Sequence, residues 1–232
     1  MLPKHTLAPF EEALASLRNH VLMMASLATR SLDNALLGLF QRDAELCATA
    51  IADDEEIDQL EKQIDQDGIE VLLRFQPVAS DLRRVVSAMR LSTNLERIGD
   101  QAVNIARKAR KLSQHRPLAE VALIAPMRDL AMQMFKDSVD AYMNEDVELG
   151  RGLKARDKAL DELNANASRT LIARMADDPE ELRGYLNLMF VARHLERVGD
   201  HATNIGEDAV FAAAAEDIRH QPVAAESSGQ GG

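Results

Sequence analysis

Cysteine and tryptophan are nearly absent from this chain of 232 residues: Cys47 is the only cysteine, and there is no tryptophan. One cysteine cannot form a disulfide within the chain, and it cannot supply the several thiolates of a zinc or iron–sulfur site. A lone cysteine also fits a reducing compartment. These absences exclude a disulfide-stabilised fold and cysteine-rich metal sites.

Glycine, proline and aromatic residues are also scarce, with 11 glycines, 7 prolines and 3% aromatic residues. An all-β protein needs many turns, and turns need glycine and proline. The residues that recur instead, chiefly alanine, leucine, glutamate, aspartate, arginine and methionine, favour long helices. Because 46% of the residues are hydrophobic, the chain can bury a sizeable core. We therefore expect an all-α fold.

The chain lacks a long apolar run and an excess of positive charge. Its longest apolar run, 121–127, is far shorter than the roughly 20 residues that span a bilayer, and the first fifteen residues contain no signal-peptide core. The formal net charge of −11 argues against binding nucleic acid, because phosphates attract a positive surface. We expect a soluble, cytoplasmic protein that contacts a membrane only through partners.

Apolar residues spaced by three and four predict six long helices. Proline or aspartate marks most of the expected starts, because proline suits the first helical position and aspartate caps a helix N-terminus. The expected helices are 9–42, 43–76, 77–111, 117–142, 146–176 and 178–218. Residues 113–118 form the expected linker, and 219–232 are expected to be a disordered tail.

The two halves of the chain repeat each other. Residues 94–105 match residues 194–205 at eight of twelve positions, an offset of 100, while positions in the second helix of each half match at an offset of 103. The change of three residues between the second and third helices indicates a duplicated unit with one deletion. We predict two tandem three-helix bundles, with domains at 1–113 and 114–218.

Pairs of acids four residues apart recur in both halves, and residues i and i+4 share a helix face. Like charges so placed repel, so solvent or a cation must offset them. An asparagine one turn further on adds a neutral oxygen ligand, and such oxygens suit magnesium, calcium, manganese or iron. The candidate metal ligands are Asp54, Asp58, Glu96, Asp100 and Asn104 in the first half and Asp157, Asp161, Glu196, Asp200 and Asn204 in the second.

Two other interpretations of these acids stay open. Asp54 and Asp58 lie among further acids and could form a solvated face. The acids of the third and sixth helices could instead pair with arginines, such as Arg83 or Arg97 in the first half and Arg183 or Arg197 in the second. The duplication favours metal, because a solvated surface does not require the same residues in both halves.

Two further pairs of residues carry expectations. Gly99 and Gly199 fall within helices, where glycine costs about 1 kcal/mol against alanine, so we expect a neighbouring helix to approach closely there. His194 and His201 are seven residues apart and share one helix face. They are either ordinary core or surface histidines or additions to the second metal site.

The repeated sequence Leu-Glu-Arg-(Ile/Val)-Gly-Asp-x-Ala-x-Asn-Ile, at 95–105 and 195–205, resembles the signature of the PhoU family, the phosphate-specific transport accessory proteins. The segment Gln-Pro-Val-Ala-Ser-Asp-Leu-Arg at 76–83 also resembles that family's first repeat, and the match spans 8–215. The resemblance implies two three-helix PhoU repeats. Some family members bind multinuclear metal clusters through such acids. Carried over to this chain, the metal-binding positions are Asp54, Asp58, Glu96, Asp100, Asp157, Asp161, Glu196 and Asp200.

The resemblance leaves the metal open among divalent or trivalent ions of iron, manganese, zinc, magnesium and calcium. The second half departs from the first where Lys158 and Ala159 replace Glu55 and Glu56. Metal affinity is therefore expected to differ between the halves.

The same resemblance implies a cytoplasmic negative regulator of the phosphate-starvation response rather than an enzyme. Such a protein acts with the ATPase of the Pst phosphate ABC importer and with a phosphate-sensing histidine kinase. The alternative is a metal-dependent enzyme or metal-storage bundle that uses the same carboxylates. A homodimer is also expected, because family members are often dimers and some apolar residues lie outside the main helix seams. These residues are Leu36, Leu37, Leu186 and Met189.

Overall fold

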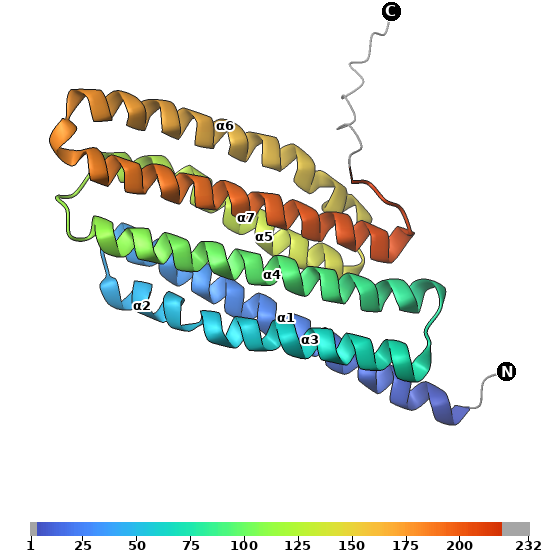
Figure 1. Cartoon of the computed structure of the whole chain (residues 1–232). Helices are drawn as coiled ribbons and strands as arrows, with labels where there is room; N and C mark the ends of the chain where they lie inside the picture. Colours follow the sequence, from blue (N-terminus) through green and yellow to red (C-terminus); the bar gives the residue numbers. More distant parts are fainter. Residues whose placement is uncertain (1–3, 220–232) are drawn as a thin grey trace, which may run out of the picture.

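The structure, a computed structural model, describes residues 4–219, with side chains described from residue 8, and this part of the chain is almost entirely helical (Figure 1). Its helices are α1 Lys4–Gln41, α2 Ala44–Ala52, α3 Asp54–Phe75, α4 Ala79–Leu112, α5 Ile124–Asn144, α6 Val147–Asp177 and α7 Leu182–Ala214. Two short 3₁₀ turns, η1 Ala119–Leu123 and η2 Pro179–Glu181, precede α5 and α7. The all-α prediction is confirmed. None of the helices found within 4–219 is long and apolar enough to cross a membrane.

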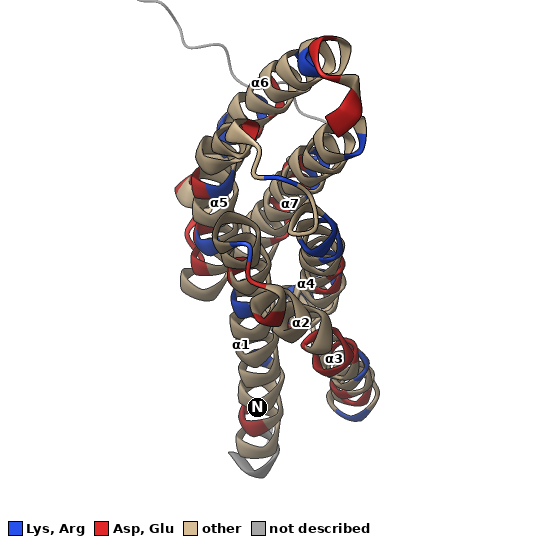
Figure 2. Ribbon diagram, turned by 90° about the vertical axis from the view of Figure 1, so that its left-hand side faces the viewer, with Lys and Arg blue, Asp and Glu red and all other residues tan. Residues whose placement is uncertain are grey.

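The helices form the two predicted three-helix bundles, with α2 and α3 together serving as one outer helix of the first bundle (Figures 1 and 2). The central helices α4 and α7 lie side by side and join the bundles. They run antiparallel, because Asn94 contacts His201 while Gln101 contacts His194. The outer segments α3 and α6 pack on α4 and α7 respectively. The domain boundaries at 1–113 and 114–218 stay a prediction.

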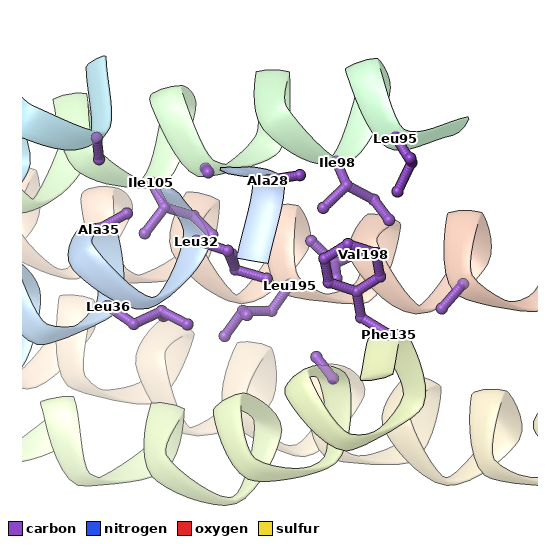
Figure 3. Packing of buried hydrophobic residues seen from close by; sticks show 14 of the residues in the cluster. Ala28, Leu32, Ala35, Leu36, Leu95, Ile98, Ile105, Phe135, Leu195 and Val198 are labelled. Carbon is purple, nitrogen blue, oxygen red and sulfur yellow. The ribbon is translucent and has the colours of Figure 1, made fainter. Parts of the chain in front are cut away.

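One continuous hydrophobic core extends through both bundles. Figure 3 shows Leu32 of α1 and Ile105 of α4 close to Leu195 of α7, with Phe135 of α5 nearby. All four side chains are fully buried. Each bundle therefore completes the core of the other, and we expect burial of this shared apolar surface to be the main force that holds the repeats together.

The second expected helix is divided at Asp53, which corrects the prediction of one helix over 43–76. Asp43 caps α2 as predicted, accepting hydrogen bonds from two backbone N–H groups of its first turn. Asp53 is 8% exposed, and it accepts hydrogen bonds from Arg30 Nε and Nη2 at 3.2 and 2.8 Å. The backbone of Asp53 still bonds to Thr49 and Ile57. The apolar pattern therefore continues from α2 into α3, and for this reason the sequence did not indicate a break between the two helices.

Several helix ends also differ from the prediction. The first helix begins at Lys4, with Pro9 inside it rather than at its start. After the linker, η1 intervenes, so α5 begins at Ile124 and not at Pro117. Similarly, η2 precedes α7, so this helix begins at Leu182 rather than at 178. It ends at Ala214 instead of 218, because Ala215 adopts a left-handed backbone conformation. Of the predicted tail, 219–232, all but Arg219 lies outside the described residues.

The apolar residues that suggested a dimer differ in how far the monomer buries them. Leu36 is fully buried in the shared core. Leu37, Leu186 and Met189 are half-buried. Leu36 therefore takes no part in an exposed dimer surface, whereas the other three side chains keep part of their surface accessible.

Candidate functional site

In the first repeat, α3 brings Asp54 and Asp58 towards the acids of α4. Burial, followed by the negative charges of Asp100, Glu61 and Asp58, raises the pKa of Glu96 to about 7. Burial and the charges of Asp58 and Asp100 likewise raise the pKa of Asp54. Carboxylates from both helices are thus close enough to repel one another. Acids of α3 and α4 therefore affect one another's pKa, while their service as a shared set of metal ligands stays a prediction.

Two members of this first group differ in accessibility. Asp100 is exposed, whereas Glu96 and Asn104 are half-buried on the same helix. The sequence analysis missed Glu61, which lies one turn beyond Asp58 and whose pKa is raised by burial and by neighbouring acids. Figure 2 shows that acidic residues are dense along α3. The continuing spacing of acids on this helix was the signal that could have identified Glu61.

In the second repeat, α6 and α7 bring the corresponding acids together. Burial raises the pKa of Asp157 to about 6, with further contributions from Asp200, Asp161, Glu196 and Glu207. Asp157 Oδ1 and Glu196 Oε2 are buried and have no hydrogen-bond partner. A buried carboxylate oxygen without a partner is costly. A bound cation is one way to satisfy both oxygens.

The remaining members of the second group are more open. Asp161, Asp200 and Asn204 are exposed. Asn204 Nδ2 also lies 3.5 Å from Asn94 Oδ1 of α4, so its amide points partly towards the other repeat. Within the described residues, no group of three or more His, Cys, Asp or Glu side chains is arranged so that it could hold a metal ion. The ten metal ligands therefore remain a prediction, supported by the facing acids and the two unpaired oxygens.

The two helix glycines allow the acid-bearing helices to approach each other, as expected. A Cβ atom placed on Gly99 would lie 2.9 Å from Ile57 Cδ1, and one on Gly199 would lie 2.5 Å from Leu160 Cδ2. The Gly199 Cβ would also lie 3.3 Å from Asp157 Oδ1. These distances are too short for unstrained contacts, so Ile57 or Leu160 would have to move. Glycine at both positions therefore keeps the stripes close.

The salt-bridge interpretation holds for Glu196 of the second repeat, although its partner is not one of the arginines that were expected. Arg193 Nη1 donates to Glu196 Oε1 at 2.6 Å. In the first repeat, Arg83 Nε instead lies 3.5 Å from the carbonyl oxygen of Ala212. The sequence reasoning missed Arg193, although the offset of 100 places it opposite Thr93, just before the repeated motif.

His194 and His201 lie between the repeats rather than with the acids. His194 Nδ1 is 2.8 Å from Gln101 Oε1, and His201 Nδ1 is 3.3 Å from Asn94 Oδ1. Burial and nearby cationic side chains lower the pKa of each histidine to about 4. Both histidines are therefore partly buried where α7 meets α4. This geometry does not support the interpretation that they complete the second metal site.

Comparison with known proteins identifies the family. The model of the PhoU domain matches residues 21–109 and 124–209. The chain is 34% identical over 223 residues to the "Phosphate-specific transport system accessory protein PhoU homolog" of Pseudomonas putida, covering 94% of this chain and 86% of that protein. It is also 34% identical over 221 residues to the homolog of the same name in Caulobacter vibrioides, covering 95% and 96% of the two chains.

Solved structures agree with these matches. The crystal structure of PhoU from Pseudomonas aeruginosa has a TM-score of 0.87 and 31% identity, covering 89% of this chain and all of that one. The phosphate transport system regulatory protein PhoU from Streptococcus pneumoniae has a TM-score of 0.83 and 27% identity, covering 90% and 99%. The chain belongs to the PhoU family, a family of accessory and regulatory proteins rather than enzymes.

Proposed function

We propose that this protein is a cytoplasmic regulator of phosphate uptake that keeps the phosphate-starvation response off when phosphate is plentiful. The observation that carries the proposal is the presence of both PhoU domains, in order, in a chain that covers most of a relative named as a phosphate-specific transport system accessory protein. Its partners would be the ATPase of the Pst phosphate importer and a phosphate-sensing histidine kinase.

A deletion strain tests this regulatory role. Without the protein, a phosphate-starvation reporter should be active in phosphate-rich medium, and the intact gene supplied in trans should silence it again. Loss of the Pst ATPase or of the histidine kinase in the same strain then separates the two partners. Unchanged reporter activity in the deletion strain would reject the proposal.

The proposal includes a metal in each repeat. Asp54, Asp58, Glu96, Asp100 and Asn104 would hold one group of ions, and Asp157, Asp161, Glu196, Asp200 and Asn204 the other. A divalent or trivalent cation of iron, manganese, zinc, magnesium or calcium would offset the repulsion among the acids. Support comes from the two buried, unpaired oxygens of the second repeat. Metal titration followed by the melting temperature tests this part.

Association with a second copy is also proposed, on a different surface from the one first expected. Leu22 and Met23 of α1 are 41% and 54% exposed, and they border a cavity of about 370 Å³ between α1 and α3. Exposed neighbouring apolar residues are typical of contact surfaces. Sedimentation at tens of micromolar should show a dimer that Met23→Glu weakens; a 25.6 kDa species alone would reject this part.

A further inference from the structure

A cavity of about 300 Å³ opens where the two repeats meet, at the end of the molecule where α4 begins and α7 ends (Figure 1). Its walls come from α1 and α4 of the first repeat and from α5 and α7 of the second. Leu14, Leu17 and Ala88 belong to its apolar lining, while Arg18 and Tyr142 add polar groups. Apolar walls with a few polar groups, around a volume of this size, are typical of small-molecule sites.

The duplicated fold has a smaller cavity, of about 120 Å³, at the equivalent place near the opposite end of the molecule. The repeat offsets of 103 and 100 relate the two linings: Leu39 corresponds to Tyr142, and Leu112 corresponds to Ala212. Both leucines are 4% exposed, so their side chains are packed into the protein. The larger cavity therefore has a small residue and a hydroxyl group where the smaller one has two leucines.

The hydroxyl group of Tyr142 is a donor without an acceptor. It forms no hydrogen bond with any described residue, and the side chain is half-buried. Burial raises the pKa of Tyr142, and the positive charge of Arg18 is the main effect that opposes this rise. The phenol therefore stays protonated at neutral pH and has the guanidinium of Arg18 close to it. Such a hydroxyl group can donate to an oxygen atom of a ligand.

The charged residues at the rim favour an anion beside Arg18. Arg84 donates two hydrogen bonds to Glu145 Oε1, at 3.1 and 3.0 Å, so these two charges compensate each other. Arg18 Nη2 donates instead to the neutral carbonyl oxygen of Met143, at 2.7 Å. The charge and the other donors of Arg18 are thus available, and a guanidinium binds a carboxylate or phosphate through two donors. Glu11, exposed at the same rim, works against an anion.

We propose that this cavity is a binding site for a small organic anion. Carboxylate or phosphate oxygens of the ligand accept hydrogen bonds from Arg18 and from the Tyr142 hydroxyl group, and its apolar part lies against Leu14 and Leu17. Because the walls belong to both repeats, a bound ligand contacts both and stabilises the folded protein. The inference depends neither on metal binding nor on the regulatory role proposed above.

Tyrosine fluorescence provides the test, because the chain has two tyrosines and no tryptophan. In the Tyr185→Phe protein, Tyr142 is the only emitter. Butyrate or butyl phosphate should change its fluorescence saturably, and the ratio of the two affinities shows which anionic group the cavity prefers. Neutral 1-butanol, with a similar apolar part, should bind about tenfold more weakly. Inorganic phosphate, which has the charge without the apolar part, should also bind more weakly than butyl phosphate.

Variants of the lining locate the bound probe. Arg18→Gln should weaken its binding about tenfold, or by about 1.4 kcal/mol, whereas Arg169→Gln, which removes the same charge from the exposed surface of α6, should leave it unchanged. Glu11→Gln should strengthen binding. Ala212→Leu, which introduces the residue of the other repeat, should fill the cavity and abolish binding. Tyr142→Phe removes the fluorescent reporter, so its weaker binding is measured by calorimetry.

The outcomes that overturn the proposal are distinct. Circular dichroism checks that each variant folds, and Arg18→Gln decides the matter if Ala212→Leu does not fold. An anion response that Arg18→Gln leaves unchanged would place the anion elsewhere. Equal affinity for 1-butanol would show an apolar cavity without anion recognition, and equal affinity for inorganic phosphate and butyl phosphate would remove the role of the apolar walls. No saturable response to butyrate or butyl phosphate would reject the site.

Discussion

The two repeats hold their first and second helices together with ion pairs of opposite polarity. In the first repeat Arg30 of α1 binds Asp53, which separates α2 from α3. In the second repeat, Arg156 of α6 occupies the position equivalent to Asp53, and it binds Asp137 of α5. Both pairs join the same two helices of the unit, with the charges exchanged. Each repeat thus has an ion pair between its first and second helices, but the partners on the first helix, Arg30 and Asp137, do not occupy equivalent positions.

The repeats also differ in how closely their second helix approaches their third. A Cβ atom on Gly150 would lie 2.8 Å from the backbone oxygen of Gly206. The equivalent positions in the first repeat are Cys47 and Ala106, which are both buried. The second repeat thus has backbone-to-backbone contact where the first has side chains. The second helix of the second repeat, α6, is also continuous, while that of the first repeat is divided at Asp53.

The largest expected effect tests whether the repeats unfold together. Leu32 and Phe135 occupy equivalent positions in the two repeats, and both are fully buried in the shared core. Phe135→Ala should lower the free energy of unfolding by about 3–5 kcal/mol, and Leu32→Ala by about 2–5 kcal/mol. Because the core is shared, each should shift one common transition in urea. A variant that splits the transition into two would show independent repeats.

A second prediction concerns the two ends of the α4–α7 contact. At one end, Asp208 is 7% exposed and lies 3.5 Å from Arg90. At the other end, the equivalent residue Lys108 lies over the ring of Phe190, 4.3 Å from its centroid. Only the Asp208 end has a buried carboxylate, and burial raises the pKa of Asp208 to about 6, against the opposing effect of Arg90.

The raised pKa of Asp208 gives a pH dependence of known sign. Between pH 4 and 6 the folded protein holds the Asp208 proton more tightly than the unfolded chain, so this contribution to stability is lost as pH rises through that range. As the pH rises from 4 to 6.5, the free energy of unfolding of Asp208→Asn should increase by about 2–3 kcal/mol relative to that of the wild type. Phe190→Leu, at the other end, should show no such slope. Equal slopes in both variants would contradict the assignment.

The third and smallest effect tests the close contact of α6 and α7. Gly150→Ala should destabilise by about 1–2 kcal/mol, because the backbone of Gly206 cannot yield as a flexible side chain can. Gly152→Ala is the control two residues away, since no side chain and no neighbouring helix lies within 4 Å of its added Cβ. That variant should be stabilised by up to about 1 kcal/mol through helix propensity. Urea denaturation of both proteins decides whether the contact is as close as described.

Local sequence signals predicted much of the fold. The helix-capping roles of Asp43 and Asp146 were visible, because an aspartate before an apolar run is a local signal, and both caps are present. The close approach at Gly99 was also predicted, because a helix glycine repeated in both halves needs a local reason. The break between helices at Asp53 was not predicted, because it depends on Arg30 of another helix. Long-range partners of this kind leave no periodic mark in the sequence.

The same distinction applies to the candidate site. The duplication predicted that acids of neighbouring helices face one another. Burial is the main cause of the raised pKa values of Glu96 and Asp157, and acids of the neighbouring helix contribute to both. The pairing of Glu196 with Arg193 could have been predicted and was missed, because residues three apart on a helix face one another whereas the adjacent Arg197 lies on another face. The burial of Leu36 was missed because it arises from the shared core.

The central claim is that the facing acids of both repeats bind metal. If they do, a chelator should lower the melting temperature of the wild-type protein, because a ligand bound only to the folded state stabilises by RT ln(1 + [L]/Kd), about 2.7 kcal/mol at a hundredfold excess over Kd. The double variant Asp100→Asn, Asp200→Asn should lose the chelator effect and be no less stable than metal-free wild type. A wild-type melting temperature that chelator leaves unchanged, with the Asn variant destabilised, would contradict the claim and support salt bridges instead.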